Sequence, residues 1–202
     1  MPIAVEPPTT RDTLLASLVQ VDAQATALWR SFEPSEYFQR PADGGWSPAQ
    51  NVAHLRRSTV PVIWTLNTPR TLLTILFGRP RAASRSFEEV RGVYRQTLAA
   101  GGQAGLFGPP RQRPPRDPAR AQARSLDRWQ RLIPRLTTAI GTWKESELDG
   151  YRVLHPLIGK LTVREMLHFT LYHLTHHSEI VARRQERTAS ETAVLQRRTT
   201  SL

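Results

Sequence analysis

The sequence predicts an all-α protein: a four-helix bundle with a short extra helix and long connections between its helices. Three observations support this fold class. Apolar residues recur at steps of three and four in the long segments, which is the period of an amphipathic helix. Three segments open with a helix capping box, at Ser47, Ser86 and Thr162. No stretch of useful length alternates as a β-strand does.

The first expected helix covers residues 10–31. Its apolar residues recur at helical spacing and form one stripe: Leu14, Leu15, Leu18, Val21, Ala25 and Leu28. Turn-forming residues at 33–35 and 40–45 then break the pattern. We therefore expect a long connection before the second helix.

The second helix is expected to begin at Ser47. The Ser47 hydroxyl can accept from the third helical N–H, Gln50 can reach back, and Pro48 fits the first helical position. Pro61 is expected to kink this helix rather than to end it. The short extra helix follows at residues 71–77.

A third helix is expected over residues 86–101, from a serine capping box to a pair of glycines. Residues 101–119 are rich in Gly, Pro and Arg and have no periodicity, so we expect an exposed, mobile loop within the same domain. The fourth helix covers residues 121–143, and Pro134 is expected to kink it.

Residues 149–160 form an ordered approach to the last helix. That helix is expected to begin at the Thr162 capping box and to end near Arg187. The sequence therefore predicts one domain over residues 1–187, followed by a polar C-terminal tail at 188–202 that can fray.

Composition narrows the classes of function. The 202 residues suffice for one domain with a core, and the absence of cysteine excludes disulfides and protein thiolate chemistry. The N-terminal residues lack the pattern of a signal peptide, and no segment has the roughly 20 apolar residues of a membrane span. We therefore expect a cytoplasmic protein without a membrane partner.

The net charge of +11 raises the question of nucleic-acid binding. This charge is almost all arginine, and it is spread along the chain. The densest basic segment, at residues 111–124, is broken by prolines and lacks the interleaved aromatic residues of a single-strand binder. The pattern argues against nucleic acid as the physiological partner.

The last helix carries the main candidate site. His173 and His177 are four residues apart, so they stack one turn above the other on a helix. Met166, Phe169 and Ile180 fall on the same side, which places both imidazoles on the apolar face. Two histidines at this spacing are a common way to present nitrogen ligands to one metal ion.

The other histidines differ in position. His176 lies at the edge of the apolar face, and His168 points away from it. Zinc and similar ions need at least three protein ligands, so a third must come from another helix. His54 is the best candidate, at the border of the apolar stripe of the second helix. The alternative is that these histidines are ordinary hydrogen-bonded side chains.

Three sequence segments carry a resemblance to a known family. Residues 46–55, WSPAQNVAHL, open the second helix, and residues 155–167, HPLIGKLTVREML, lead into the last helix. The last helix continues with YHLTHH at residues 172–177. These segments resemble the signature motifs of DinB-like proteins, the DinB/YfiT superfamily. The resemblance implies a four-helix bundle in which three histidines bind a metal ion.

Carried over by position, the resemblance implies that His54, His173 and His177 bind a divalent ion such as zinc or nickel, with one position open to water. The better-understood branches of the family use low-molecular-weight thiols, such as bacillithiol, mycothiol or glutathione, as cosubstrates. Several members form dimers, so the resemblance also implies a homodimer.

Such a centre would suit hydrolysis through bound water or transfer of a bound thiol. No general base is evident, because Glu165 is engaged in a capping box. Asn51, Ser58 and Tyr172 are candidates to hydrogen-bond a ligand histidine or a substrate. Trp46 and Trp64 are expected to fill the core rather than to line a pocket.

Three functional hypotheses follow from the sequence. The first is a metal-dependent enzyme that transfers a small thiol, or water, to a small electrophilic substrate. The second is a non-catalytic, metal-stabilised interaction module. The third, ranked last, is a basic stress protein associated with nucleic acid.

Overall fold

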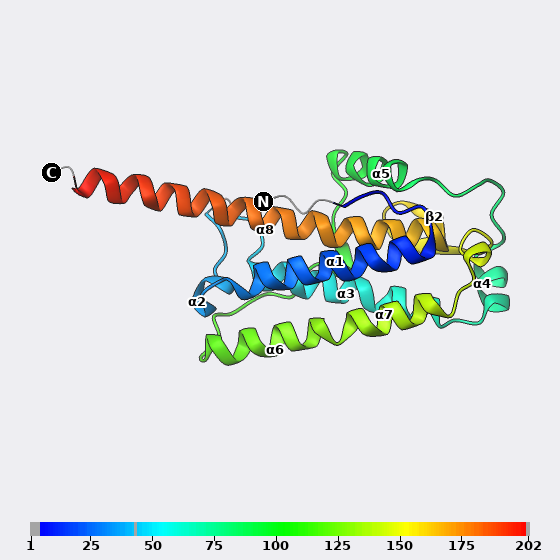
Figure 1. The fold of residues 1–202 in the computed structure, drawn as a ribbon, viewed down its shortest axis with the longest axis horizontal. Helices are drawn as coiled ribbons and strands as arrows, with labels where there is room; N and C mark the ends of the chain where they lie inside the picture. Colours follow the sequence, from blue (N-terminus) through cyan, green and yellow to red (C-terminus); the bar gives the residue numbers. More distant parts are fainter. Residues whose placement is uncertain (1–4, 43, 201–202) are drawn as a thin grey trace.

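Four helical rods lie side by side and form a bundle (Figure 1). The computed structural model describes residues 5–42 and 44–200. The rods are α1 (Arg11–Arg30), α3 (Pro48–Leu66), the pair α6 (Pro118–Gln130) and α7 (Leu132–Gly141), and α8 (Val163–Thr200). The prediction of an all-α four-helix bundle is confirmed.

Shorter elements complete the fold. α2 (Pro34–Tyr37) lies in the connection after α1, and α4 (Arg70–Phe77) is the short extra helix that the sequence predicts. α5 (Phe87–Ala99) packs against α8 at the outside of the bundle, as Figure 1 shows. The third predicted helix is therefore not one of the four rods.

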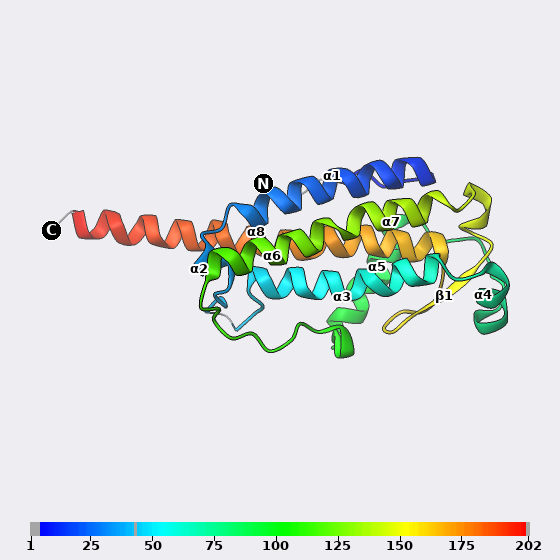
Figure 2. The same ribbon diagram turned by 90° about the horizontal axis from the view of Figure 1, so that it is seen from below.

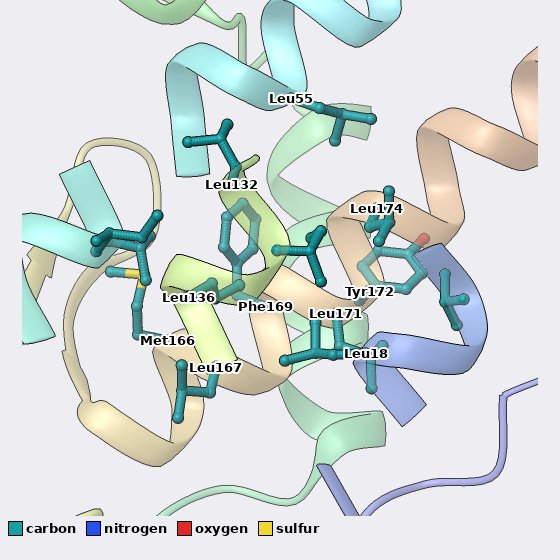
Figure 3. Packing of buried hydrophobic residues seen from close by; sticks show 14 of the residues in the cluster. Leu18, Leu55, Leu132, Leu136, Met166, Leu167, Phe169, Leu171, Tyr172 and Leu174 are labelled. Atoms are coloured by element: carbon teal, nitrogen blue, oxygen red, sulfur yellow. The ribbon is translucent and has the colours of Figure 1, made fainter. Parts of the chain in front are cut away.

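The core lies where α1, α3, α7 and α8 meet (Figure 3). Leu18, Leu55 and Leu136 come from three different rods, and each is 1% exposed or less. At the α2 end of the bundle, Trp29 and Trp129 pack edge to face with ring centroids 5.4 Å apart. Burial of such side chains contributes about 1.5–3 kcal/mol each to the stability of the bundle.

The three predicted capping boxes are all present. Ser47 accepts from the backbone N–H of Gln50, and the backbone N–H of Ser47 donates to the Gln50 side chain, both at 3.1 Å. The same reciprocal pattern opens α5 and α8. α3 continues through Pro61 without ending, as the sequence predicts.

Pro134 has a larger effect than the predicted kink. The fourth rod starts at Pro118 and is divided at Arg131 into α6 and α7. Proline has no N–H to donate to the carbonyl four residues earlier, here that of Gln130, and its ring crowds that carbonyl. The helix therefore breaks one turn before the proline.

The structure contains a β-hairpin that the sequence pattern does not predict. β1 (Arg152–His155) pairs antiparallel with β2 (Gly159–Thr162). The strands are too short for alternation to be detected, and Gly159 at the turn has a φ of +76°, which favours glycine. The hairpin leads directly into α8 and carries His155 toward the bundle.

α8 is longer than predicted. It continues to Thr200, so the expected helix end near Arg187 is wrong, and α8 projects beyond the other rods (Figure 2). The sequence after Gly159 contains no glycine or proline, so no residue there stops the helix. Despite this length, none of the helices in the described ranges is apolar enough to cross a membrane.

Candidate metal centre

Three buried histidines meet between α3 and α8. His54 comes from α3, and His173 and His177 come from consecutive turns of α8. The Nε2 atom of His173 is 2.9 Å from Nε2 of His54 and 3.1 Å from Nε2 of His177. The structure thus brings together the three histidines that the sequence singles out.

The Nδ1 atoms of His54 and His177 each face an acceptor. His54 Nδ1 is 2.8 Å from the backbone oxygen of Phe107, which can only accept a hydrogen bond. His177 Nδ1 is 2.8 Å from Oδ1 of Asn51. The amide nitrogen of Asn51 donates to two carbonyls near the start of α3, which fixes its oxygen toward His177.

Ser58 is the acceptor that faces the Nδ1 atom of His173, at a longer distance. Its Oγ is 3.4 Å from His173 Nδ1, and it is 3.1 Å and 3.0 Å from the backbone oxygens of His54 and Leu55. The single hydroxyl proton is donated to a carbonyl, so a lone pair of Ser58 is left to accept from His173. Asn51 and Ser58 therefore contact the histidines as the sequence suggests.

These contacts determine where the protons lie. A neutral imidazole carries one N–H, and each Nδ1 proton already has an acceptor, so three Nε2 lone pairs point at one another. Burial, together with the neighbouring histidines, lowers the pKa of His173 and His177 well below the ordinary value, and burial also lowers the pKa of His54. Three neutral nitrogens with oriented rings are the donor set that a divalent ion such as zinc requires.

Trp46 covers one side of this cluster. Its ring is nearly parallel to that of His177, with centroids 5.8 Å apart, and it is tilted at 4.9 Å from that of His54. Trp46 is half-buried rather than part of the core, and Trp64 on α3 is 66% exposed, so the expectation that both fill the core is wrong. It shields the histidines from solvent at the start of α3.

A cavity of about 280 Å³ adjoins the cluster. His54 and His173 form part of its wall, whereas His177 does not line it. The remaining wall is largely apolar and comes from α3, α8, the β-hairpin and the short helix η1 (Gly105–Phe107), with Val62, Met166, Phe169, Leu106 and Leu154 among its residues. The cavity can admit a small molecule to the two histidines.

The loop at residues 101–119 forms one wall of this cavity. Its residues are exposed or half-buried, as expected, but several are tied to the bundle. Phe107 accepts from His54, and Arg57 donates to the backbone oxygen of Leu106 at 2.7 Å. Gln112 further along the loop accepts from the Ser47 hydroxyl at 2.6 Å. These contacts attach the loop to the start and the middle of α3.

Two polar residues of the cavity were not predicted from the sequence. Tyr94 of α5 lies with its ring centroid 6.0 Å from that of His173, and burial raises its pKa to about 12, so its hydroxyl stays protonated. His155 accepts from the backbone N–H groups of Leu157 and Ile158 through Nδ1, which leaves its proton on Nε2. Helical periodicity cannot predict that either residue lines the cavity. The β-hairpin brings His155 to it, and the outer helix α5 brings Tyr94.

Other candidates lie elsewhere. Tyr172 packs between α5 and α8 against Phe87 and His176, and the described contacts include no hydrogen bond from it to the three histidines. His168 lies away from the three clustered histidines, as the helical spacing predicts, but it is buried, at 3% exposed, and contacts Phe87. The reason is that α5 covers this second face of α8.

Glu165 has a structural role, as the sequence predicts. It completes the capping box of Thr162 and forms an ion pair with Arg85 at 2.8 Å. Both contacts lower its pKa against the opposing effect of burial. With its oxygens engaged in this way, Glu165 is not a general base for the cavity.

We expect the buried His155 to make stability depend on pH. Burial lowers its pKa to about 4, from about 6.5 when unfolded, so the unfolded state binds the extra proton between these values. Its contribution is complete above pH 6.5 and falls by about 2 kcal/mol between pH 7 and pH 5. In a His155→Asn variant, whose amide oxygen can accept the same N–H groups, urea unfolding should show a pH dependence smaller by this amount. An unchanged pH dependence would contradict the assignment.

The fold and the cluster together define a class of protein: a four-helix bundle with a buried group of three histidines that can hold a metal ion. A match to a family model identifies the family of this protein. The model of the DinB superfamily matches residues 17–181, so the chain belongs to the DinB superfamily. No curated protein matches the chain.

Two solved structures share the fold. YfiT from Bacillus subtilis, described as a probable metal-dependent hydrolase with an unusual four-helix bundle topology, is 20% identical with a TM-score of 0.56, and the match covers 89% of this chain and 87% of YfiT. The colibactin self-resistance protein ClbS, solved in complex with double-stranded DNA, is 14% identical with a TM-score of 0.52, over 88% of this chain and 96% of ClbS. At these identities the likeness shows the fold alone.

Proposed function

We propose that this protein is a metal-dependent enzyme in which His54, His173 and His177 bind a divalent ion beside the substrate cavity. One observation carries the proposal: three Nε2 lone pairs converge next to a cavity that can admit a small molecule. The description of YfiT as a probable metal-dependent hydrolase agrees with this function. Zinc and nickel are the ions that we favour, because imidazole suits both.

A divalent ion held by three neutral imidazoles lowers the pKa of a water or thiol ligand, which supports hydrolysis or thiol transfer. The chain has no cysteine, so a thiol would be a low-molecular-weight cosubstrate. The substrate that we propose is a small electrophile with an apolar body, since the cavity wall is largely apolar.

In this proposal, residues of the chain orient the three histidines and polarise the substrate. Asn51, Ser58 and the Phe107 carbonyl hold the three imidazole rings in place through Nδ1. Tyr94 and His155 bring an O–H and an N–H to the cavity, where they can donate to an oxygen of the substrate that gains charge. The apolar wall excludes water from this oxygen and strengthens both hydrogen bonds.

Activity should depend on both the metal and Tyr94. We expect protein loaded with zinc or nickel to hydrolyse activated esters, or to conjugate glutathione, mycothiol or bacillithiol to a small alkylating probe. A Tyr94→Phe variant should keep its metal content and lose roughly 10–100-fold in kcat, because one donor to the developing charge is removed. Turnover that survives complete removal of the metal would exclude the proposed enzyme.

The non-catalytic module remains the second candidate, and the same assays separate it from the enzyme. A metal-stabilised module would bind the ion and gain thermal stability, but it would bind no thiol and turn over no electrophile. The cavity next to His54 and His173 opens toward solvent and favours the enzyme, because a structural metal site needs no such access.

Nucleic-acid binding has one further observation in its favour, since ClbS was solved with double-stranded DNA and this chain has a net charge of +11. Binding that depends on charge alone should weaken steeply as salt rises from 50 to 200 mM. DNA binding that persists at physiological salt would support this candidate over the small-molecule enzyme. We also propose a cytoplasmic homodimer, which sedimentation equilibrium can test.

A further inference from the structure

A second cavity, of about 420 Å³, lies between α5, α8 and the N-terminal segment. None of the three clustered histidines lines it. Arg91 and Arg95 reach it from α5, and Arg183 reaches it from α8. We propose that this cavity binds a small organic anion, with a carboxylate or phosphate held by the arginines and an apolar body against the cavity wall.

The charges around the cavity are not balanced. Arg183 pairs with Glu179 at 3.4 Å, and Arg91 pairs with Glu88 at 3.1 Å. Arg95 makes no ion pair within the described part of the chain. Three arginines therefore line the cavity with one carboxylate, that of Glu179, and the excess positive charge favours an anionic ligand.

A buried donor at the cavity lacks an acceptor within the described residues. The Nε atom of Arg91 is buried and has no hydrogen-bond partner. The Tyr172 hydroxyl, at the same cavity, makes no described hydrogen bond within the protein, but it is not fully buried and can donate to a ligand. Buried donors in native proteins are nearly always paired, so an unpaired one beside a cavity indicates a missing acceptor.

The rest of the wall indicates the shape of the ligand. Val5, Phe87 and Leu98 line the cavity and offer apolar surface to a ligand body. The Arg91 guanidinium lies 5.7 Å from the centre of the Tyr172 ring, so the charged and aromatic parts of the site are adjacent. A small aromatic or branched anion matches this arrangement better than a bare inorganic ion.

The anion site is distinct from the metal centre but close to it. Tyr94 stands between them, with its ring centroid 6.1 Å from that of Tyr172 and 6.0 Å from that of His173. Tyr172, which the sequence suggests as a substrate contact, thus belongs to this second cavity. The inference rests on the arginines and the cavity and does not depend on a bound metal.

Calorimetric titration of the purified full chain with phenyl phosphate, benzoate and inorganic phosphate tests the proposal. We expect saturable binding of phenyl phosphate or benzoate, and the tighter of the two identifies the anion. An Arg95→Gln, Arg183→Gln double variant should bind at least tenfold more weakly, and Tyr172→Phe about 2–10-fold more weakly. Arg128→Gln, on the exposed surface of α6, is the matched control and should bind as the wild type does.

Three outcomes would overturn the proposal. The first is no saturable binding of either organic anion. The second is equal affinity of the wild type and the double variant when both show the same helical circular dichroism. The third is inorganic phosphate that binds as tightly as phenyl phosphate, which would remove the role of the apolar wall.

Discussion

A His173→Ala variant, purified without a histidine tag, is expected to retain less than a tenth of the zinc or nickel that the wild type binds. His173 is the central member of the cluster, because its Nε2 is the atom near both His54 and His177. Its removal leaves two nitrogen donors, which is fewer than a stable zinc site needs. Elemental analysis of both proteins after dialysis against the metal measures the difference.

The control for this experiment is another buried histidine of the same helix. His168→Gln changes a residue of α8 that is 3% exposed and lies outside the cluster, so its metal content should match that of the wild type. Equal trace metal in the wild type and in His173→Ala would exclude the metal centre. A loss in both variants would instead indicate damage to α8.

The histidines illustrate what the sequence can establish. Periodicity alone places His173 and His177 on one face of α8, because their spacing fixes their angle on any helix. The prediction of their partner His54 rested mostly on the family resemblance, since the pattern of α3 does not indicate which residue of α8 it contacts. The same periodicity correctly separates His168 from this face, but it does not show that His168 is buried, because a fifth helix covers another face of α8 outside the bundle.

The surroundings of the site depend on contacts between distant segments. The Phe107 carbonyl orients His54 across 53 residues, and no local pattern in the loop indicates this contact. His155 enters the cavity wall because a four-residue strand pairs with its neighbour, a length at which alternation cannot be detected. The capping boxes at Ser47, Ser86 and Thr162 were in contrast predicted, because each depends on residues only three apart, although the further box that opens α1 at Thr10 was not.

Addition of zinc or nickel to the metal-free protein is expected to raise its Tm by roughly 5–10 °C. An ion at 100 times its Kd stabilises the folded state by about 2.7 kcal/mol, and about 1 kcal/mol shifts the Tm of a chain of this size by roughly 2–4 °C. The physical source here is the relief of repulsion among the three Nε2 lone pairs of His54, His173 and His177. Differential scanning calorimetry in the presence and absence of a chelator measures the shift.

Two controls test whether the rise in Tm comes from metal binding at the three histidines. Magnesium should have little effect, because it prefers oxygen ligands and the cluster offers only nitrogen. A His177→Ala variant should show no shift with zinc, since it keeps only two of the three nitrogens. A similar shift in that variant would place the stabilising ion elsewhere in the chain. If the wild type gains stability without turnover, the metal centre stands and the enzyme does not, which separates the two functions that the site supports.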